Sequence, residues 1–475
     1  MEEDVIQIPS GLIHHISVEQ AWYYRIIPAA ISEEAIHLYC EGVKDRSALV
    51  VELEILLGKK VRLKEITAIN LTRLLNQYYR REQQNEQILN QQLYAYSDDF
   101  LNQLIEEAKR LKSSDIHVEC YEERCRIRIR IDGLLTERYL LSKQEYPATI
   151  NRIKILANLD IAEKRLPQDG RISFKSGKLQ FDIRVSVLPA LYGEKVVLRL
   201  LNNDATNIEL NNLGFSSIDL GHYLEGVRRP NGIILISGPT GSGKTTTLYA
   251  TLKLLNKNTR NILTVEDPIE YTLDGVNQVQ LKENIGLTFA AALKTFLRQD
   301  PDVIMVGEIR DTETANMAIR AALTGHLVLS TIHTNSAWGT VSRLIDMGIP
   351  PFLVANTLNT SVAQRLVRLL CLDCKKEAGI PADFYPQRFK PPFHVAVQFL
   401  PLGCESCYYT GYSGRMAVYE VISLDHELSE AVKTGTSPAE ALFKEKGIRR
   451  IAENAFHLFA NGQTSFEEIS PLLYY

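Results

Sequence analysis

The segment 238–246 reads GPTGSGKTT and directly follows an apolar run, GIILIS, at 232–237. Four residues satisfy the phosphate-loop pattern: Gly238, Gly243, Lys244 and Thr245. In that pattern, successive backbone N–H groups wrap the phosphates of a nucleotide between a buried strand and a helix. Both elements are predicted here, so the chain is expected to bind a nucleoside triphosphate on an α/β sheet.

We expect the whole loop to contact the nucleotide, that is, Gly238, Pro239, Thr240, Gly241, Ser242, Gly243, Lys244, Thr245 and Thr246. Lys244 would reach the β and γ phosphates, and the Thr245 hydroxyl would bind Mg²⁺. The helix that begins at the loop directs the positive end of its dipole at the same anion.

Length and charge restrict the class of protein. A chain of 475 residues suggests about three domains, each with its own core. The 53 Lys and Arg against 57 Asp and Glu give a net charge of −4, so the chain as a whole is not built to coat nucleic acid, although local basic strips remain possible. No run approaches about 18 apolar residues, and the N-terminus lacks a signal-peptide layout. We therefore expect a cytoplasmic protein that reaches a membrane only through partners.

Six segments are predicted along the chain. They are an N-terminal partner-docking domain at 1–79, a linker at 80–94, an α+β middle domain at 95–203, a phosphate-loop core at 204–370, a cysteine-bearing insert at 371–415 and a helical C-terminal subdomain at 416–475. In the first segment, the run 48–53 is strand-like and 66–79 is typical of a helix. The linker is rich in Gln, Asn and charge and has little to bury.

Periodicity defines the two central segments. Arginines at 124, 126, 128 and 130 alternate with apolar residues, the period of a half-buried strand. Further strands are expected at 171–174, 179–187 and 195–201, and helices at 97–112 and 147–159. Strands and helices then alternate to about residue 368, which predicts a mainly parallel sheet.

Four of the seven cysteines are arranged in two close pairs, Cys371 with Cys374 and Cys404 with Cys407. Each Cys-x-x-Cys turn can direct two thiolates at one ion, so the four predict a closed, structural zinc site. The alternative is two pairs of buried thiols. Cys40, Cys120 and Cys125 have no partner at metal spacing and are expected to pack in cores.

Several longer strings are ordered along the chain. They are SDIH at 114–117 with RIRIDG at 128–133, LPQDGR at 166–171, the phosphate loop, VEDPIEY at 265–271, LRQDPD at 297–302 with MVGEIRD at 305–311, and GHLVLSTIHTN at 325–335. Together they resemble the hexameric ATPases that drive type II secretion and type IV pilus extension, from about residue 95 to the end.

This resemblance implies a RecA-like phosphate-loop domain after a PAS-like middle domain, and a homo-hexamer that hydrolyses ATP. It also implies an inner-membrane platform protein and a docking protein as partners, and no nucleic acid. Retraction motors of the family lack the cysteine insert and a domain like 1–79, so the chain resembles the extension or secretion type. The Arg-Leu-Gly-x-x-Leu string of many relatives is absent, and only 24–79 is similar to their regulatory domain.

Two glutamates follow predicted strands, where open α/β sheets gather their sites. Glu266 is expected to activate the attacking water and Glu308 to act on the metal side, although the two roles are exchangeable. Gly307 stands where the standard motif offers an aspartate, a departure shared by the family. The alternative is that both carboxylates only cap the next helix.

Histidines and arginines complete the expected site. His326 and His333 flank one strand in the family's histidine string, which implies γ-phosphate sensing or subunit coupling; His117 is a weaker candidate. Arginine fingers of the family come from the middle domain, which implies Arg171 and Arg184, with Arg130 in reserve, acting on a neighbouring subunit. The alternative for these arginines is a solvated strand face.

Two other functions compete with a secretion or pilus motor. A nucleic-acid translocase would share the fold, but the near-neutral charge and the lack of a basic, aromatic strip argue against it. A nucleotide-gated scaffold would bind ATP and barely hydrolyse it.

Overall fold

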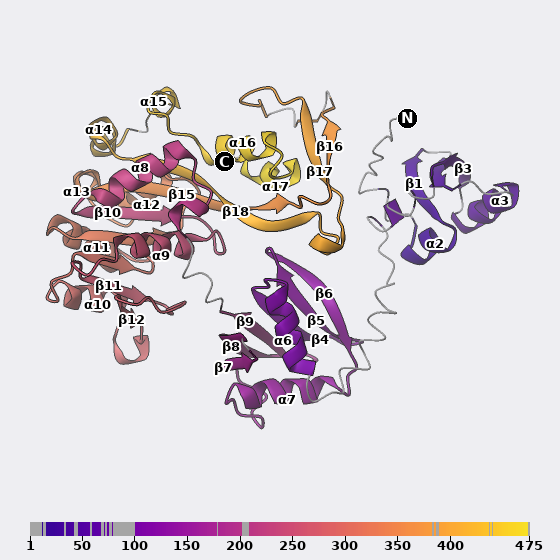
Figure 1. The fold of residues 1–475 in the computed structure, drawn as a ribbon, viewed down its shortest axis with the longest axis horizontal. Coiled ribbons are helices and arrows are strands. Elements are labelled where there is room, and N and C mark those ends of the chain that lie inside the picture. The colour runs from indigo at the N-terminus through magenta and orange to yellow at the C-terminus, as the bar shows by residue number, and fades with distance from the viewer. Residues whose placement is uncertain are drawn as a thin grey trace.

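The computed structural model in Figure 1 describes most of the chain. The described residues are 16–32, 35–41, 46–57, 59–67, 100–177, 179–201, 209–381, 389–436 and 440–473, with isolated positions at 12, 71, 74, 75, 78, 384, 385 and 438. None of the helices in these ranges has the length and apolarity that crossing a bilayer requires.

The N-terminal unit is a three-stranded sheet of β1 (Ile26–Ile31), β2 (Ala35–Cys40) and β3 (Lys60–Glu65), with α2 at Val18–Tyr23 and α3 at Arg46–Leu57. The strand predicted at 48–53 is wrong, because these residues lie in α3. Strands β2 and β3 are parallel, so their connection must cross the sheet, and a helix provides that crossover. The helix predicted at 66–79 lies largely outside the described residues.

The middle domain is a six-stranded antiparallel sheet in the order β6-β5-β4-β9-β8-β7. Its elements are α6 (Phe100–Arg110), β4 (Asp115–Cys120), β5 (Cys125–Ile131), β6 (Leu134–Leu141), α7 (Tyr146–Leu156), β7 (Gln168–Ser176), β8 (Leu179–Ala190) and β9 (Gly193–Leu200). The predicted alternation is confirmed, since Cys125, Ile127 and Ile129 of β5 are buried in one core with Leu104 and Ile105 of α6, while the arginines between them are partly exposed. The core of this domain therefore lies between the sheet and its helices.

The nucleotide-binding core contains a seven-stranded sheet in the order β12-β11-β13-β14-β10-β15-β18. Its strands are β10 (Gly232–Ser237), β11 (Ile262–Glu266), β12 (Asn277–Gln280), β13 (Val303–Val306), β14 (Leu327–Ile332), β15 (Leu358–Leu370) and β18 (Tyr412–Ser423). All neighbours are parallel except β15 and β18. The α/β fold with a mainly parallel sheet is thus confirmed.

Helices cover both faces of this sheet, as a buried parallel sheet requires. They are α8 (Ser217–Arg228), α9 (Lys244–Leu255), α10 (Phe289–Phe296), α11 (Thr312–Leu323), α12 (Gly339–Asp346) and α13 (Pro351–Thr357). Residues of α8 and α9 belong to one apolar core and residues of α10 to α13 to another. All six residues of β10 are buried, which explains its continuous apolar run.

The C-terminal part joins a small hairpin to a group of helices. Strands β16 (Lys375–Gly379) and β17 (Val397–Pro401) pair antiparallel, and α14 (His426–Thr434), α15 (Glu440–Glu445), α16 (Ile451–Ala460) and α17 (Phe466–Ile469) follow β18. Strand β18 crosses the boundary predicted at residue 415 and belongs to the main sheet. The C-terminal helices are therefore attached directly to the nucleotide-binding core.

Candidate functional site

The phosphate loop leaves the carboxyl end of β10 and enters α9 at Lys244. Gly238 and Gly243 have φ angles of +150° and +87°. A Cβ on Gly238 would lie 2.5 Å from the Gln364 carbonyl oxygen, and one on Gly243 would lie 2.8 Å from Gln364 Nε2. Glycine is required at both positions because the loop backbone passes close to β15 and adopts left-handed or strained angles.

The loop has the groups that a triphosphate needs. Lys244 Nζ donates to the carbonyls of Gly238 and Pro239 at 2.8 and 3.0 Å, so the ammonium curls over the loop. The Ser242 hydroxyl is buried and makes no hydrogen bond to a described residue. Thr245 is exposed as the second residue of α9, where its hydroxyl can reach a cation. These residues fit a bound nucleotide and Mg²⁺.

Two residues of β15 near the loop, Gln364 and Arg365, are not predicted from the sequence, and Gln364 contacts the loop directly. Gln364 Nε2 donates to the Ser242 carbonyl at 2.8 Å, and its Oε1 accepts the Thr247 hydroxyl at 2.9 Å. The buried Arg365 donates to the carbonyls of Gln364 and Asn335, both at 3.0 Å. Burial lowers the pKa of Lys244, with Glu308 opposing and Arg365 reinforcing the shift, so both charges are near the ammonium.

Parallel pairing brings the ends of four strands to one edge of the sheet. Ser237 is level with Ile332, and Val306 with Ser330 and Val265. The residues that follow these strands therefore meet beside the phosphate loop, as expected for open α/β sheets. Glu266, Glu308 and His333 all lie at this edge.

Glu266 is buried at the end of β11 and is surrounded by donors from its own domain. Its carboxylate accepts the hydroxyl of Tyr249, the hydroxyl of Thr264 at 2.6 Å and the amide of Gln278 at 3.1 Å. Burial, together with the Glu266 carboxylate, raises the pKa of Tyr249. The described contacts of Glu266 thus face inward.

Glu308 is partly exposed and faces the other predicted groups. Its Oε2 lies 3.5 Å from His333 Nε2, and its Oε1 lies 2.6 Å from an Arg310 guanidinium nitrogen. His333 follows the carboxyl end of β14 and is exposed. Glu308 and His333 are therefore side by side, within electrostatic reach of Lys244.

His326 is not brought to this edge. It precedes the first residue of β14, and its carbonyl accepts the N–H of Gly232 at 3.1 Å, at the opposite end of the strands. The six residues of β14 separate it from His333, seven residue steps or roughly 23 Å at about 3.3 Å per step. Its ring nitrogen Nδ1 lies 2.9 Å from the Ala321 carbonyl oxygen. Contact with a γ-phosphate in its own subunit is incompatible with this position.

The predicted arginine fingers pair within the chain. Arg184 on β8 donates to Glu270 Oε2 at 3.1 Å and to the Ile269 carbonyl. Arg171, opposite it on β7, is largely exposed and pairs with Asp182 at 2.9 Å. Arg130 lies 3.3 Å from Asp115. Arg184 is therefore the one of these three that contacts the nucleotide-binding core.

His117 lies on the charged face of the middle sheet. It is 9% exposed, and neither ring nitrogen bonds to a described residue. Burial and the neighbouring cations Arg130 and Lys195 lower its pKa, which favours the neutral ring. This environment fits a packed histidine of the middle domain.

The four paired cysteines come together at one point. Their sulfur atoms all lie within 4.8 Å of one another, and Sγ–Sγ distances are 3.8 Å for Cys371–Cys404, Cys374–Cys407 and Cys404–Cys407. The backbone N–H groups of Cys404 and Gly411 each donate to Cys407 Sγ at 3.2 Å. The cluster can hold a metal ion. Cys40 and Cys125 are buried in other cores, and Cys125 contacts Cys120 across β4 and β5.

The sequence is similar to known secretion proteins over most of its length. The family described as Type II/IV secretion system protein matches residues 91–471. The putative type II secretion system protein E of Escherichia coli K12 is 46% identical over 390 residues, covering 81% of this chain and 78% of the relative. The type IV pilus assembly ATPase PilB of Myxococcus xanthus is 47% identical over 385 residues, covering 78% and 66%.

Solved structures also share this fold. The pilus retraction motor PilT with bound ADP matches with a TM-score of 0.54 and 26% identity, covering 78% of this chain and 95% of that one. The ATPase DotB of Legionella pneumophila matches with a TM-score of 0.60 at 22% identity, covering 80% and 96%, and shows the fold alone. Together with the phosphate loop, these matches show that the chain is an ATPase of the kind found in type II secretion and type IV pilus assembly. It belongs to the Type II/IV secretion system protein family.

Proposed function

We propose that this ATPase is a cytoplasmic motor that moves a membrane-embedded platform protein. The proposal is supported above all by the gathering of Lys244, Glu308 and His333 at one edge of the sheet. Movement of a residue that contacts the terminal phosphate there would be transmitted to the rest of the domain. Relatives named for type II secretion and for type IV pilus assembly support both cargos, a pseudopilin or a pilin.

For the chemistry, we assign the loop residues 238–246 to the phosphates and Thr245 to Mg²⁺. We favour Glu308 over Glu266 as the carboxylate that orients the attacking water, which exchanges the roles first expected. Support comes from the inward contacts of Glu266 and from the proximity of Glu308 to Lys244 and His333. Thr245 would hold Mg²⁺, which would supply positive charge against the charge that develops on the phosphates.

We further propose that six copies form a ring in which Arg184, and Arg171 beside it, reach the nucleotide of a neighbouring subunit. An arginine fork matches phosphate oxygens and holds its charge at every working pH. His326, remote from its own phosphate loop, remains a candidate for subunit coupling only.

Zinc is proposed for the four cysteines. A tetrahedral ion with Zn–S bonds of about 2.3 Å places its sulfurs about 3.8 Å apart. The three Sγ–Sγ distances of 3.8 Å match that spacing. Four thiolates fill the coordination shell, so the ion would be structural. It would hold the two Cys-x-x-Cys turns together at the base of the β16–β17 hairpin.

The test is ATP turnover by the purified chain with and without membranes that contain the platform protein. Turnover should rise with those membranes and should not respond to duplex DNA. Lys244→Ala should abolish turnover, because the phosphates lose their main cation. Stimulation by DNA that falls steeply with salt would favour a translocase. Equal, negligible rates for wild type and Lys244→Ala in all conditions would favour a scaffold.

A further inference from the structure

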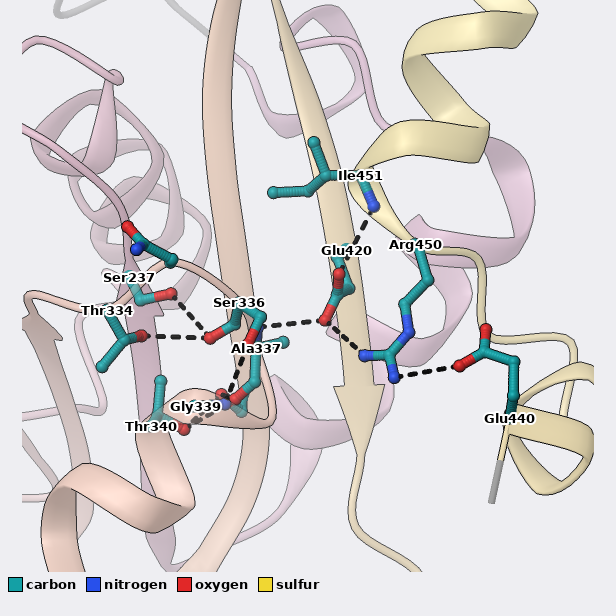
Figure 2. Close-up of polar contacts among 12 residues, drawn as sticks. Ser237, Thr334, Ser336, Ala337, Gly339, Thr340, Glu420, Glu440, Arg450 and Ile451 are labelled. Carbon is teal, nitrogen blue, oxygen red and sulfur yellow. Dashed lines mark hydrogen bonds and ion pairs between the residues drawn. The ribbon is translucent and has the colours of Figure 1, made fainter. Parts of the chain in front are cut away.

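Glu420 is a buried carboxylate of β18 that binds two segments far apart in the sequence (Figure 2). It is 3% exposed. Its Oε1 accepts the backbone N–H of Ala337 at 3.0 Å and a guanidinium N–H of Arg450 at 3.2 Å, and its Oε2 accepts the N–H of Ile451 at 3.3 Å. A buried charge is costly unless donors surround it, so these contacts hold both segments to one point.

The first segment, residues 333–340, begins at His333 after β14 and runs into the first two residues of α12. One peptide unit of this segment, between Ser336 and Ala337, has contacts in two directions (Figure 2). Its N–H donates to Glu420, and its carbonyl accepts the hydroxyls of Thr334 at 3.0 Å and Ser237 at 3.5 Å. Ser237 immediately precedes the phosphate loop. Because a peptide unit is planar and stiff, a shift of Glu420 would move this unit against Ser237, the residue before the loop.

The second segment is the start of α16. Arg450 uses its other terminal nitrogen to donate to Glu440 of α15 at 3.3 Å, and its guanidinium lies 4.3 Å from the ring centre of Phe443. Ile451, which also donates to Glu420, is the first residue of α16. Helices α15 and α16 are thus tied to the carboxylate that holds the Ser336–Ala337 peptide.

We infer that Glu420 is a positioning residue. It holds His333 beside Glu308 and couples the position of His333 to the C-terminal helices α15 and α16. The inference rests on the proposed role of His333 at the nucleotide. When Arg450 and Glu420 stay paired, the 333–340 segment is held in its hydrolytic position. Displacement of α15 and α16 by a partner or a neighbouring subunit would therefore shift the 333–340 segment through this carboxylate.

The test compares two neutralised carboxylates that contact the same arginine. Glu420→Gln keeps the shape of the side chain but loses the charge that binds Ala337, and should lower kcat about tenfold with KM within about twofold. Glu440→Gln removes an exposed contact of Arg450 and should leave kcat within about twofold. Equal kcat for wild type and Glu420→Gln would overturn the inference.

A second comparison separates the inference from the function on which it rests. In a His333→Ala background, Glu420→Gln should change kcat less than about twofold, because the two act through one segment. If His333→Ala lowers kcat and Glu420→Gln adds its full effect, the coupling is refuted while the proposed function stands. If His333→Ala alone has wild-type kcat, the proposed role of His333 fails, and this inference with it.

A further variant covers the case in which Glu420→Gln does not fold. Arg450→Lys keeps a positive charge but loses the planar guanidinium that donates to Glu420. Reduced kcat with unchanged KM, and faster amide exchange at 333–340 than in wild type, would support the coupling. Wild-type kcat and exchange in Arg450→Lys would overturn it.

Discussion

The guanidinium of Arg184 lies 3.1 Å from Glu270 Oε2, so an arginine of the middle domain is held by the nucleotide-binding core of its own chain. Carboxylate and phosphate oxygens suit the same planar fork of donors. Under the proposed action in trans, Glu270 would compete for Arg184 with the phosphates of a neighbouring subunit. Exchange between the two partners would link nucleotide binding to movement of the middle domain.

Mixing two inactive variants should restore turnover if Arg184 acts between subunits. Arg184→Ala and Glu308→Gln should each lower kcat, the first by about 10³-fold, the usual contribution of an arginine finger. In mixed rings, an intact Glu308 can face an intact Arg184 from its neighbour, so phosphate release should exceed the sum of the separate rates. Glu270→Gln keeps the arginine and should retain turnover. A mixture no faster than that sum would contradict action in trans.

The two glutamates at the sheet edge should differ on neutralisation. Glu308→Gln should lower kcat about 10²-fold or more while ATP still binds, because Glu308 lies near Lys244 and His333. Glu266→Gln should act mainly on stability, because its carboxylate accepts the hydroxyls of Tyr249 and Thr264. Measuring kcat, nucleotide affinity and melting temperature for both variants tests this assignment. A larger loss of kcat in Glu266→Gln would restore the roles first expected.

Local patterns were sufficient where one rule decides the structure. The strand, loop and helix around Lys244 and the alternation in β5 follow from spacing alone. The run 48–53 was misassigned because a short apolar segment fits a helix and a strand equally well. Only the parallel pairing of β2 with β3, a tertiary relation, requires a helix there.

Contacts that depend on the order of strands in the sheet cannot be predicted from the sequence alone. Gln364 follows the phosphate loop by more than 100 residues and contacts it only because β15 lies next to β10. His326 and His333 flank the same strand, yet the direction of β14 places only His333 beside Glu308. No spacing rule distinguishes them without the sheet.

Acid should weaken the middle domain through Glu119. Burial alone would raise its pKa, but Arg128 and Lys195 outweigh this and lower the pKa to about 2 from 4.5. As pH falls from 4.5 towards 2, the unfolded carboxylate takes up a proton before the folded one, so stability is lost over that window.

At neutral pH, Glu119→Gln should therefore destabilise the middle domain by on the order of 3 kcal/mol. The difference in unfolding free energy between the variant and wild type should narrow as pH falls from 4.5, the ordinary pKa of the carboxyl, towards about 2, its pKa in the folded protein. This difference is measured by urea unfolding, monitored through amide exchange in β4 and β5. The exposed Glu123→Gln serves as the control and should match wild type. A gap that widens in acid would refute the charge network as its source.

Removing one thiol from the cysteine cluster should remove the metal. Purified protein should contain about one zinc per chain, since the four sulfurs have tetrahedral spacing. Cys404→Ser should lower the zinc content by at least about tenfold. It should also speed amide exchange around 371–375 and 404–411, because the ion takes the place of a hydrophobic core there. Cys120→Ser, a half-buried thiol of the middle domain, should keep its zinc. Metal analysis that finds none in wild-type protein with four reduced thiols would leave the cluster as packed cysteines.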